Sequence, residues 1–248
     1  MAQLLISKLK AVFLHALVTA VVAVFSAFFV FVLWYPSGLA RYMGGGELYF
    51  LVLSVELVLG PLMSLIIYHP GKSFVHLRRD YAVIGVLQVA ALTYGLHSTY
   101  IARPVFQVFV IDKVVVVSAL ELDSNDLNVA PESFSKLSVW GPMDVCVSLP
   151  ADAEAKSTLI FSALAGKDVE FFPQYYSACE GDERIVGAFP RERLEAILRT
   201  QNRLSEFSTK LPAAYSWLPV RSRFGSWVQI FPGNEISEAY YLDVDPYM

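Results

Sequence analysis

The fold is decided by residues 47–70, which read ELYFLVLSVELVLGPLMSLIIYHP. Glu56 is the only charged residue between Glu47 and Lys72. About 20 apolar residues, each adding a rise of ~1.5 Å along a helix, cross a hydrocarbon layer that is about 30 Å thick. The stretch therefore predicts a membrane-spanning helix over about 47–67, with one carboxyl group near the middle of the span.

The carboxyl group of Glu56 defines a polar face on this helix. Placing an ionised carboxylate at that depth costs at least about 2.5 kcal/mol, so we expect it to face protein and to find a polar partner. Gly60 and Ser64 follow at intervals of four residues and share a helix face with Glu56. Pro61 removes one backbone donor. This small, polar face favours close contact with a neighbouring helix.

The composition places part of the chain in a membrane. Of the 248 residues, 55% are hydrophobic and 17% are charged, and the mean hydropathy is +0.49. A soluble domain is about 25% charged. Residues 1–100 carry six basic and three acidic side chains, whereas residues 101–248 carry thirteen basic and twenty acidic ones. The acidic second part argues against binding of nucleic acid, which requires clustered Lys and Arg.

Two further apolar stretches flank the central one. No charged residue occurs in 11–40, which predicts a first span over 11–34. This run is about twice as long as the ~7–15-residue apolar core of a signal peptide, so we expect it to be retained in the mature protein. A third span is predicted over 81–100. The first 102 residues would therefore form a three-helix membrane domain.

Polar residues on the two flanking spans are candidates to meet Glu56. Gln88 lies within the third predicted span and is a candidate hydrogen-bond partner for that carboxyl group. His15 lies near the beginning of the first span. The favoured interpretation of His15 is a histidine that faces lipid headgroups, and membership of a polar helix face is the alternative.

The loops predict the orientation of the chain. The N-terminus and the loop 69–80 carry five Lys and Arg residues, whereas the first loop and the beginning of the tail carry only Arg41 and Arg103. The positive-inside rule then places the N-terminus in the cytoplasm and residues 101–248 outside. The first loop, 35–46, contains three consecutive glycines and is interpreted as a flexible turn without a nucleotide site.

The remainder, 103–248, predicts a small periplasmic α+β domain with an antiparallel sheet and two helices. A stretch rich in Val and Phe at 105–119 predicts two strands or one long bent strand, and the alternating tail predicts further strands. Helices are expected over 153–165 and 190–205. The overall fold class is therefore α+β, with three transmembrane helices preceding the sheet domain.

Cys146 and Cys179 both lie in this outer part. In an oxidising compartment they are expected to pair, and two reduced buried thiols remain the alternative, because spacing alone does not establish bonding geometry. Residues 101–248 contain no histidine, and a cysteine pair alone makes a poor zinc site. We therefore expect no metal and no cofactor.

The outer part also lacks the residues of common catalytic sets. Without histidine, a Ser-His-Asp or Cys-His arrangement is excluded. Asp112, Asp243 and Asp245 are candidates for acid–base chemistry, but solvated turns are the favoured interpretation. A set of aromatic residues is either a binding surface or, preferably, core. This set comprises Phe171, Phe172, Tyr175, Tyr176, Tyr240 and Tyr241.

The order of motifs along nearly the whole chain resembles the type IV pilin accessory protein family, the TfpX/TfpZ group. The most specific features are the acidic Glu56 four residues before Gly60-Pro61, the loop Pro70-Gly71-Lys72, and Arg103-Pro104 before a strand rich in Val and Phe. The motifs that carry the resemblance read VLWYP, GGGELYFLVLSVELVLGPLMSLIIYHPGK, DYAVIGVLQVAALTYGL, ARPVFQVFVIDKVVVV, FSALAGKDVEFFPQYY, LPVRSRFGSWVQIF and YYLDVDPY.

The resemblance implies a bacterial inner-membrane protein that stabilises or presents the major pilin and so modulates pilus assembly. It implies no enzymatic activity and no cofactor. We expect the partners to be the lipid bilayer and the transmembrane helix and head of the major pilin. On this hypothesis the pilin helix is received by Glu56, Gly60 and Ser64, with Gln88 and His15. Alternatively, Glu56 only holds its own three helices together. A membrane-anchored ligand sensor and a pilin- or lipid-modifying enzyme are the other functions considered.

Overall fold

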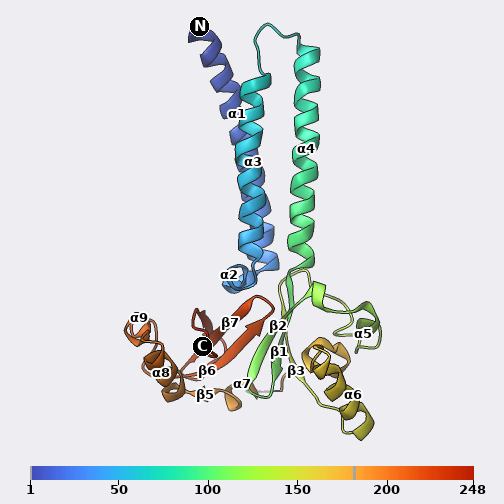
Figure 1. The fold of residues 1–248 in the computed structure, drawn as a ribbon, viewed down its shortest axis with the longest axis vertical. Helices are drawn as coiled ribbons and strands as arrows, with labels where there is room; N and C mark the ends of the chain where they lie inside the picture. Colours follow the sequence, from blue (N-terminus) through green and yellow to red (C-terminus); the bar gives the residue numbers. More distant parts are fainter. Residues whose placement is uncertain (1, 181–182) are drawn as a thin grey trace.

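The computed structural model describes residues 2–180 and 183–248, and three long helices stand side by side next to a sheet domain (Figure 1). Each of these helices is long and apolar enough to cross a membrane. They are α1 (Ala2–Phe28) with its π-helical continuation η1 (Phe29–Trp34), α3 (Gly45–Ile67) and α4 (Phe74–Ile101). The prediction of an α+β chain with three candidate spans is confirmed.

The arrangement of the three helices is asymmetric. Both α1 and α4 pack along α3, whereas α1 and α4 make little contact with each other. Gly95 of α4 brings one pair close, because a β-carbon at this position would lie 2.5 Å from Val52 of α3. The central helix of the trio is therefore the stretch that contains Glu56.

The first loop differs from its prediction as a flexible turn. It consists of the short helical turns η2 (Pro36–Gly38) and α2 (Leu39–Tyr42), and α3 already begins at Gly45. A β-carbon at Gly45 would lie 2.5 Å from the ring of Tyr35, so glycine is needed here for close approach. The Tyr35 hydroxyl donates a hydrogen bond to the Thr99 carbonyl oxygen at 3.0 Å. The prediction of flexibility was wrong because these residues pack into a core.

The described residues form one eight-stranded sheet, in the order β4-β3-β1-β2-β6-β7-β8, with β5 pairing β6. The β1–β3 and β2–β6 pairings are parallel and the others are antiparallel, so the sheet is mixed rather than wholly antiparallel. Parallel neighbours require crossover connections, which here contain helices. The strands are β1 (Pro104–Val110), β2 (Lys113–Ser118), β3 (Met143–Val147), β4 (Tyr176–Ser177), β5 (Phe189–Pro190), β6 (Tyr215–Ser222), β7 (Gly225–Pro232) and β8 (Tyr240–Leu242).

The stretch 105–119 folds as two strands, one of the two alternatives that the sequence left open. Strands β1 and β2 pair antiparallel from Pro104 opposite Ser118 to Val110 opposite Lys113. Ile111, in the turn between them, adopts a φ of +60°. This hairpin occupies the middle of the sheet.

Short helices flank the two ends of the sheet, with α5 and α6 near β3 and α8 and α9 near β6 (Figure 1). Helix α6 is capped by Asp152, whose carboxylate accepts a hydrogen bond from the Ala155 amide at 2.8 Å. The helix predicted over 190–205 is divided into α8 and α9 because Asn202, with a φ of +56°, interrupts it. The helices are α5 (Ser124–Asn128), α6 (Ala153–Leu164), α7 (Glu183–Val186), α8 (Arg191–Thr200) and α9 (Leu204–Phe207), and the 3₁₀ turns are η3 (Ala119–Glu121), η4 (Val169–Phe171) and η5 (Pro173–Tyr175).

One hydrophobic core joins the first loop to the sheet. Tyr35, Leu39 and Met43 are almost completely buried and belong to the same cluster as Trp227 and Phe231 of β7. Two other clusters lie within the outer domain, one around β1 and β3 and one under α8 and α9. The membrane helices are therefore attached to the outer domain by shared packing as well as by the chain itself.

Candidate functional site

A polar cluster lies inside the helical trio, and all five residues predicted from the sequence meet there. The two ring nitrogens of His15 bridge the other two helices, with Nδ1 2.6 Å from Ser64 Oγ and Nε2 2.9 Å from Gln88 Oε1. An amide oxygen only accepts, so Nε2 carries the proton that is donated to Gln88. In the neutral ring, Nδ1 then accepts the hydroxyl proton of Ser64. The favoured interpretation of His15 as a headgroup-facing residue was wrong.

Gly60 makes this bridge possible. A β-carbon at Gly60 would lie 2.7 Å from His15 Nε2 and closer still to Gln88 Nε2. A β-carbon does not approach other heavy atoms this closely in proteins, so any larger residue would displace the two side chains. The glycine is therefore the point at which α1 and α4 both approach α3.

Glu56 lies one turn before Gly60 and is also directed into the trio. Its residue surface is 7% exposed, and Ser64 is completely buried. Gln88 lines the same cavity as Glu56 and is its hydrogen-bond neighbour, while the amide oxygen of Gln88 accepts from His15. Ser64 is covered by His15 of α1, whereas Glu56 and Gly60 also line a cavity of about 310 Å³ between α3 and α4, so the reception of a partner helix at this face stays a prediction.

A second, larger groove lies between α1 and α4, and Leu53 and Glu56 of α3 line its inner part. Its main part has a volume of about 660 Å³ and includes Ala11, His15, Gly85 and Gln88 in its lining. A narrower part of about 190 Å³ continues from the same histidine and glutamine down to Glu56. We call these two adjoining cavities, which share His15, Val18, Gly85 and Gln88, the α1–α4 groove.

The chemistry of the α1–α4 groove is that of a helix-binding surface. Small residues widen it: a β-carbon at Gly85 would have no atom within 4 Å, and Ala11 and Ala23 lie on the opposite wall. His15, Gln88 and Glu56 supply polar groups along an otherwise largely apolar lining. Small residues and a few polar groups are what allow helices to associate within lipid.

A second hydrogen-bonded group, which the sequence did not indicate, fastens α1 to α3. The Tyr49 hydroxyl donates to the Ala23 carbonyl oxygen at 2.6 Å and lies 2.9 Å from Ser26 Oγ. Nearer the N-terminus, Lys8 Nζ donates to the Leu65 carbonyl oxygen at 3.0 Å. These contacts hold α1 against α3 along its length and leave the side toward α4 open.

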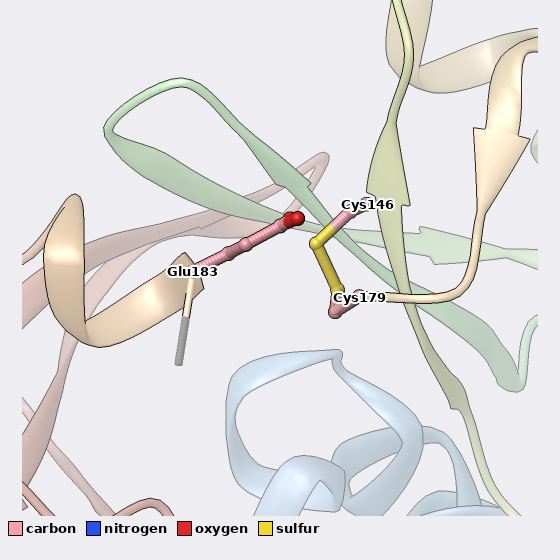
Figure 2. Close-up of side chains that lie close together, drawn as sticks. All are labelled: Cys146, Cys179 and Glu183. Carbon is pink, nitrogen blue, oxygen red and sulfur yellow. A yellow bond between two sulfur atoms is a disulfide. The ribbon is translucent and has the colours of Figure 1, made fainter. Parts of the chain in front are cut away.

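In the outer domain, Cys146 and Cys179 form the disulfide that was one of the two expected states (Figure 2). The carboxylate of Glu183 points toward the bonded sulfurs, and potential ligand atoms of the three residues lie within 4.8 Å of one another. Metals bind cysteine as the thiolate, and a disulfide offers none. The disulfide therefore joins β3 to the segment after β4 and is not a metal centre.

The remaining candidates of the outer domain do not gather into one site. Asp243 forms an ion pair of 2.6 Å with Arg41, and both side chains are more than half exposed. Asp112 is exposed in the turn between β1 and β2. Among the aromatic residues, Tyr176 is buried in the core around β1, whereas Tyr241 lies on β8 at the other end of the sheet. The solvated interpretation holds for Asp112 and Asp243, and the core interpretation holds for Tyr176.

Comparison with known proteins connects this architecture to fimbrial assembly. The family described as Fimbrial assembly protein FimB matches residues 3–44. Two fimbrial assembly proteins of Dichelobacter nodosus are similar over most of their length. The serogroup I protein is 25% identical over 239 residues, covering 93% of each chain, and the serogroup E1 protein is 28% identical over 200 residues, covering 81% of this chain and 74% of the relative.

A third relative supports the assignment of the chain to a family most directly. The Dichelobacter nodosus fimbrial assembly protein of serogroups C1 and C2 is 33% identical over 105 residues, which are 42% of this chain and 80% of that protein. No solved structure matches the chain. With its three membrane-competent helices and its sheet domain, the chain belongs to the fimbrial assembly protein FimB family.

Proposed function

We propose that this chain is an inner-membrane accessory protein of type IV pilus biogenesis that binds the major pilin and stabilises or presents it in the bilayer. The family assignment supports a role in fimbrial assembly. The resemblance to the TfpX/TfpZ group supports the assignment to type IV pili. The observation that carries the proposal is the α1–α4 groove, which has a largely apolar lining and polar groups at His15, Gln88 and Glu56.

A membrane-anchored pilin presents one long apolar helix to its surroundings, and the α1–α4 groove has the chemistry to receive it. Gly85 and Ala11 allow the backbones to approach, as small residues do at helix interfaces in lipid. Each polar contact across such an interface is worth about 0.6–2 kcal/mol. In this proposal Glu56, at the base of the groove, meets a polar group or the N-terminal amine of the pilin helix.

The proposed topology has a cytoplasmic N-terminus and an outer domain in the periplasm. It is supported by the excess of Lys and Arg in the N-terminus and in the second loop. The disulfide between Cys146 and Cys179 supports an oxidising location for the outer domain. In this proposal residues 1–102 form the membrane domain and 103–248 the periplasmic domain that contacts the pilin head.

The proposal is tested by site-specific photo-crosslinking in intact membranes that contain pilin. A crosslinking residue at Val89, which lines the α1–α4 groove, is expected to capture the major pilin. The matched control is Val24, which is similarly exposed but does not line the groove. Equal capture of pilin from both positions, or none from Val89 when pilin is abundant, would contradict the proposal.

A further inference from the structure

The outer domain carries exposed apolar side chains on the surface that adjoins the long helices. Trp140 is 73% exposed and Phe224 is 52% exposed, although large aromatic side chains are usually mostly buried. Leu120 and Val139 are exposed as well. We call these four side chains the helix-side patch. None of them lines the α1–α4 groove, so nothing below depends on the binding of pilin.

The loop that carries Trp140 lies against the end of the first candidate span. A β-carbon at Gly141 would lie 2.7 Å from the ring of Pro36 and 3.7 Å from the carbonyl oxygen of Leu33. Leu33 is still part of the first candidate span, which ends at Trp34. The backbone next to Trp140 therefore reaches the level of the last turn of this span.

The same loop is also fixed to the end of the third candidate span. Arg103 is 3% exposed, and its Nε donates to the Ser138 carbonyl oxygen at 2.9 Å while its Nη1 donates to the Tyr100 carbonyl oxygen at 2.8 Å. The Arg103 guanidinium also lies over the Tyr100 ring, 3.8 Å from its centroid. One buried side chain thus ties the loop to the last turn of α4, so the position of Trp140 is set by the helices.

The other members of the helix-side patch lie beside helix ends too. Phe224 is in the turn between β6 and β7, and a β-carbon at Gly44, the residue before α3, would lie 3.1 Å from its ring. This hairpin lies next to α2 (Figure 1). Leu120 follows Ala119, whose amide donates to the Arg103 carbonyl oxygen at 3.0 Å. The patch therefore adjoins the outer ends of all three candidate spans.

Aromatic residues and cations at this level match the chemistry of a lipid headgroup layer. Tryptophan is enriched where a span leaves the bilayer, because its ring is apolar and its N–H group can donate to water or headgroups. Trp34 and Tyr100 form such a pair here, with ring centroids 5.2 Å apart. Arg223 and Lys136 are exposed next to the patch in the chain, where they can reach lipid phosphates.

The side chains of the helix-side patch would be costly in water and favourable in an interface, because an exposed apolar patch gains free energy when it leaves water. We propose that the helix-side patch is inserted into the outer headgroup layer of the bilayer that the three helices cross. The outer domain then lies on the membrane in one fixed orientation. The loop of Trp140 and the turn of Phe224 are its two points of contact with lipid.

Photo-crosslinking to lipid tests the proposal. The purified full-length chain is placed in nanodiscs of phosphatidylethanolamine and phosphatidylglycerol, with a photo-crosslinking residue at Trp140 or at Phe224. Both positions are expected to give phospholipid adducts, identified by mass spectrometry, severalfold more often than the control. The matched control is Phe161 of α6, which is similarly exposed but lies at the end of the outer domain away from the long helices (Figure 1).

Two outcomes of this experiment would overturn the proposal. The first is a yield of lipid adduct at Trp140 no higher than at Phe161. The second is a covalent dimer of the chain in place of the lipid adduct, which would identify the helix-side patch as a contact between two copies. Both substituted positions are exposed, so the variants are expected to fold like the parent chain.

The depth of Trp140 gives an independent measurement. Tryptophan fluorescence is recorded in nanodiscs whose lipids carry bromine either near the headgroup end of the acyl chain or near the bilayer centre. The difference between the parent chain and Trp140→Phe isolates the emission of Trp140 from that of the other three tryptophans. Stronger quenching by the shallow bromine is expected, and the absence of quenching by either lipid would overturn the proposal.

Discussion

At the scale of single residues, two glycines without side chains shape the site as much as its polar residues do. Gly60 has no side chain, and this lets the His15 ring bridge Ser64 and Gln88 across three helices. Gly85, one turn before Gln88, faces open space. The two glycines therefore have opposite roles, one in closing the trio and the other in keeping the groove open.

Alanine substitutions at Gly60 and Gly85 test these two roles separately. Gly60→Ala is expected to lower the thermal midpoint of the full-length chain in detergent, because the added methyl group overlaps with His15 and Gln88 at a cost of about 1–3 kcal/mol. Gly85→Ala meets no atom within 4 Å and is expected to leave the midpoint unchanged or slightly raised. Equal destabilisation by the two substitutions would contradict this assignment.

The carboxyl group of Glu170 makes the stability of the outer domain depend on pH. The residue is 5% exposed and its Oε2 atom has no hydrogen-bond partner in the described part of the chain. Burial therefore raises the pKa of the carboxyl group, while a backbone hydrogen bond and Lys113 at 3.9 Å oppose the shift only in part. A raised native pKa means that the native state retains a proton that the unfolded state has lost. Stability is therefore full below the unfolded-state pKa of about 4.3 and falls as pH rises through the native pKa.

Glu170→Gln is expected to remove this loss of stability. At pH 8 the variant should be more stable than the parent by roughly 1 kcal/mol, because no buried charge forms, and the difference should disappear near pH 4. The measurement is the thermal midpoint across this range, with the exposed Glu132→Gln as control. A parent chain whose stability rises with pH relative to Glu170→Gln would refute the explanation.

At the scale of elements, the way the three helices pair determines where a groove remains between them. α1 is fastened to α3 by the Tyr49 and Lys8 hydrogen bonds, and α4 contacts α3 beside Gly95. Because both outer helices use the same central helix, a groove remains between them. The polar residues were predictable from the sequence, but the groove was not, because it follows from the directions in which the helices pack.

Filling the groove tests this element-scale conclusion. Gly85→Leu projects a branched side chain into open space and is expected to preserve the thermal midpoint while it reduces pilin crosslinking at Val89 severalfold. The matched control is Val24→Leu, which adds bulk at an exposed position outside the groove. Unchanged crosslinking in Gly85→Leu would place pilin elsewhere on the chain.

At the scale of the whole molecule, the first loop makes the membrane helices part of the outer domain. Tyr35, Leu39 and Met43 are buried against Trp227 and Phe231, and the Tyr35 hydroxyl reaches the end of α4. A movement of the helices is therefore coupled through packed side chains to the sheet. Under the proposed function, this packing is a physical route by which occupation of the α1–α4 groove would reach the sheet domain.

The shared core predicts how the outer part behaves alone. Residues 103–248 secreted without the helices lose three large side chains from their core, each worth about 2–5 kcal/mol when removed. We expect this fragment to be degraded rapidly in limited proteolysis, whereas the full-length chain resists. A fragment as resistant as the full-length chain would show that the loop is not required for the stability of the outer domain.

The sequence by itself determined the three apolar helices and the polar face of Glu56, Gly60 and Ser64, because apolar length and helical spacing are local properties of the chain, and it left two alternatives open at 105–119. It did not reveal strand β3, the two parallel pairings or the burial of the first loop. These depend on contacts between segments far apart in the sequence. Tertiary structure alone decided that His15 bridges the other two helices and that a groove lies between α1 and α4, since one helix face has the same sequence whether a neighbour covers it or not.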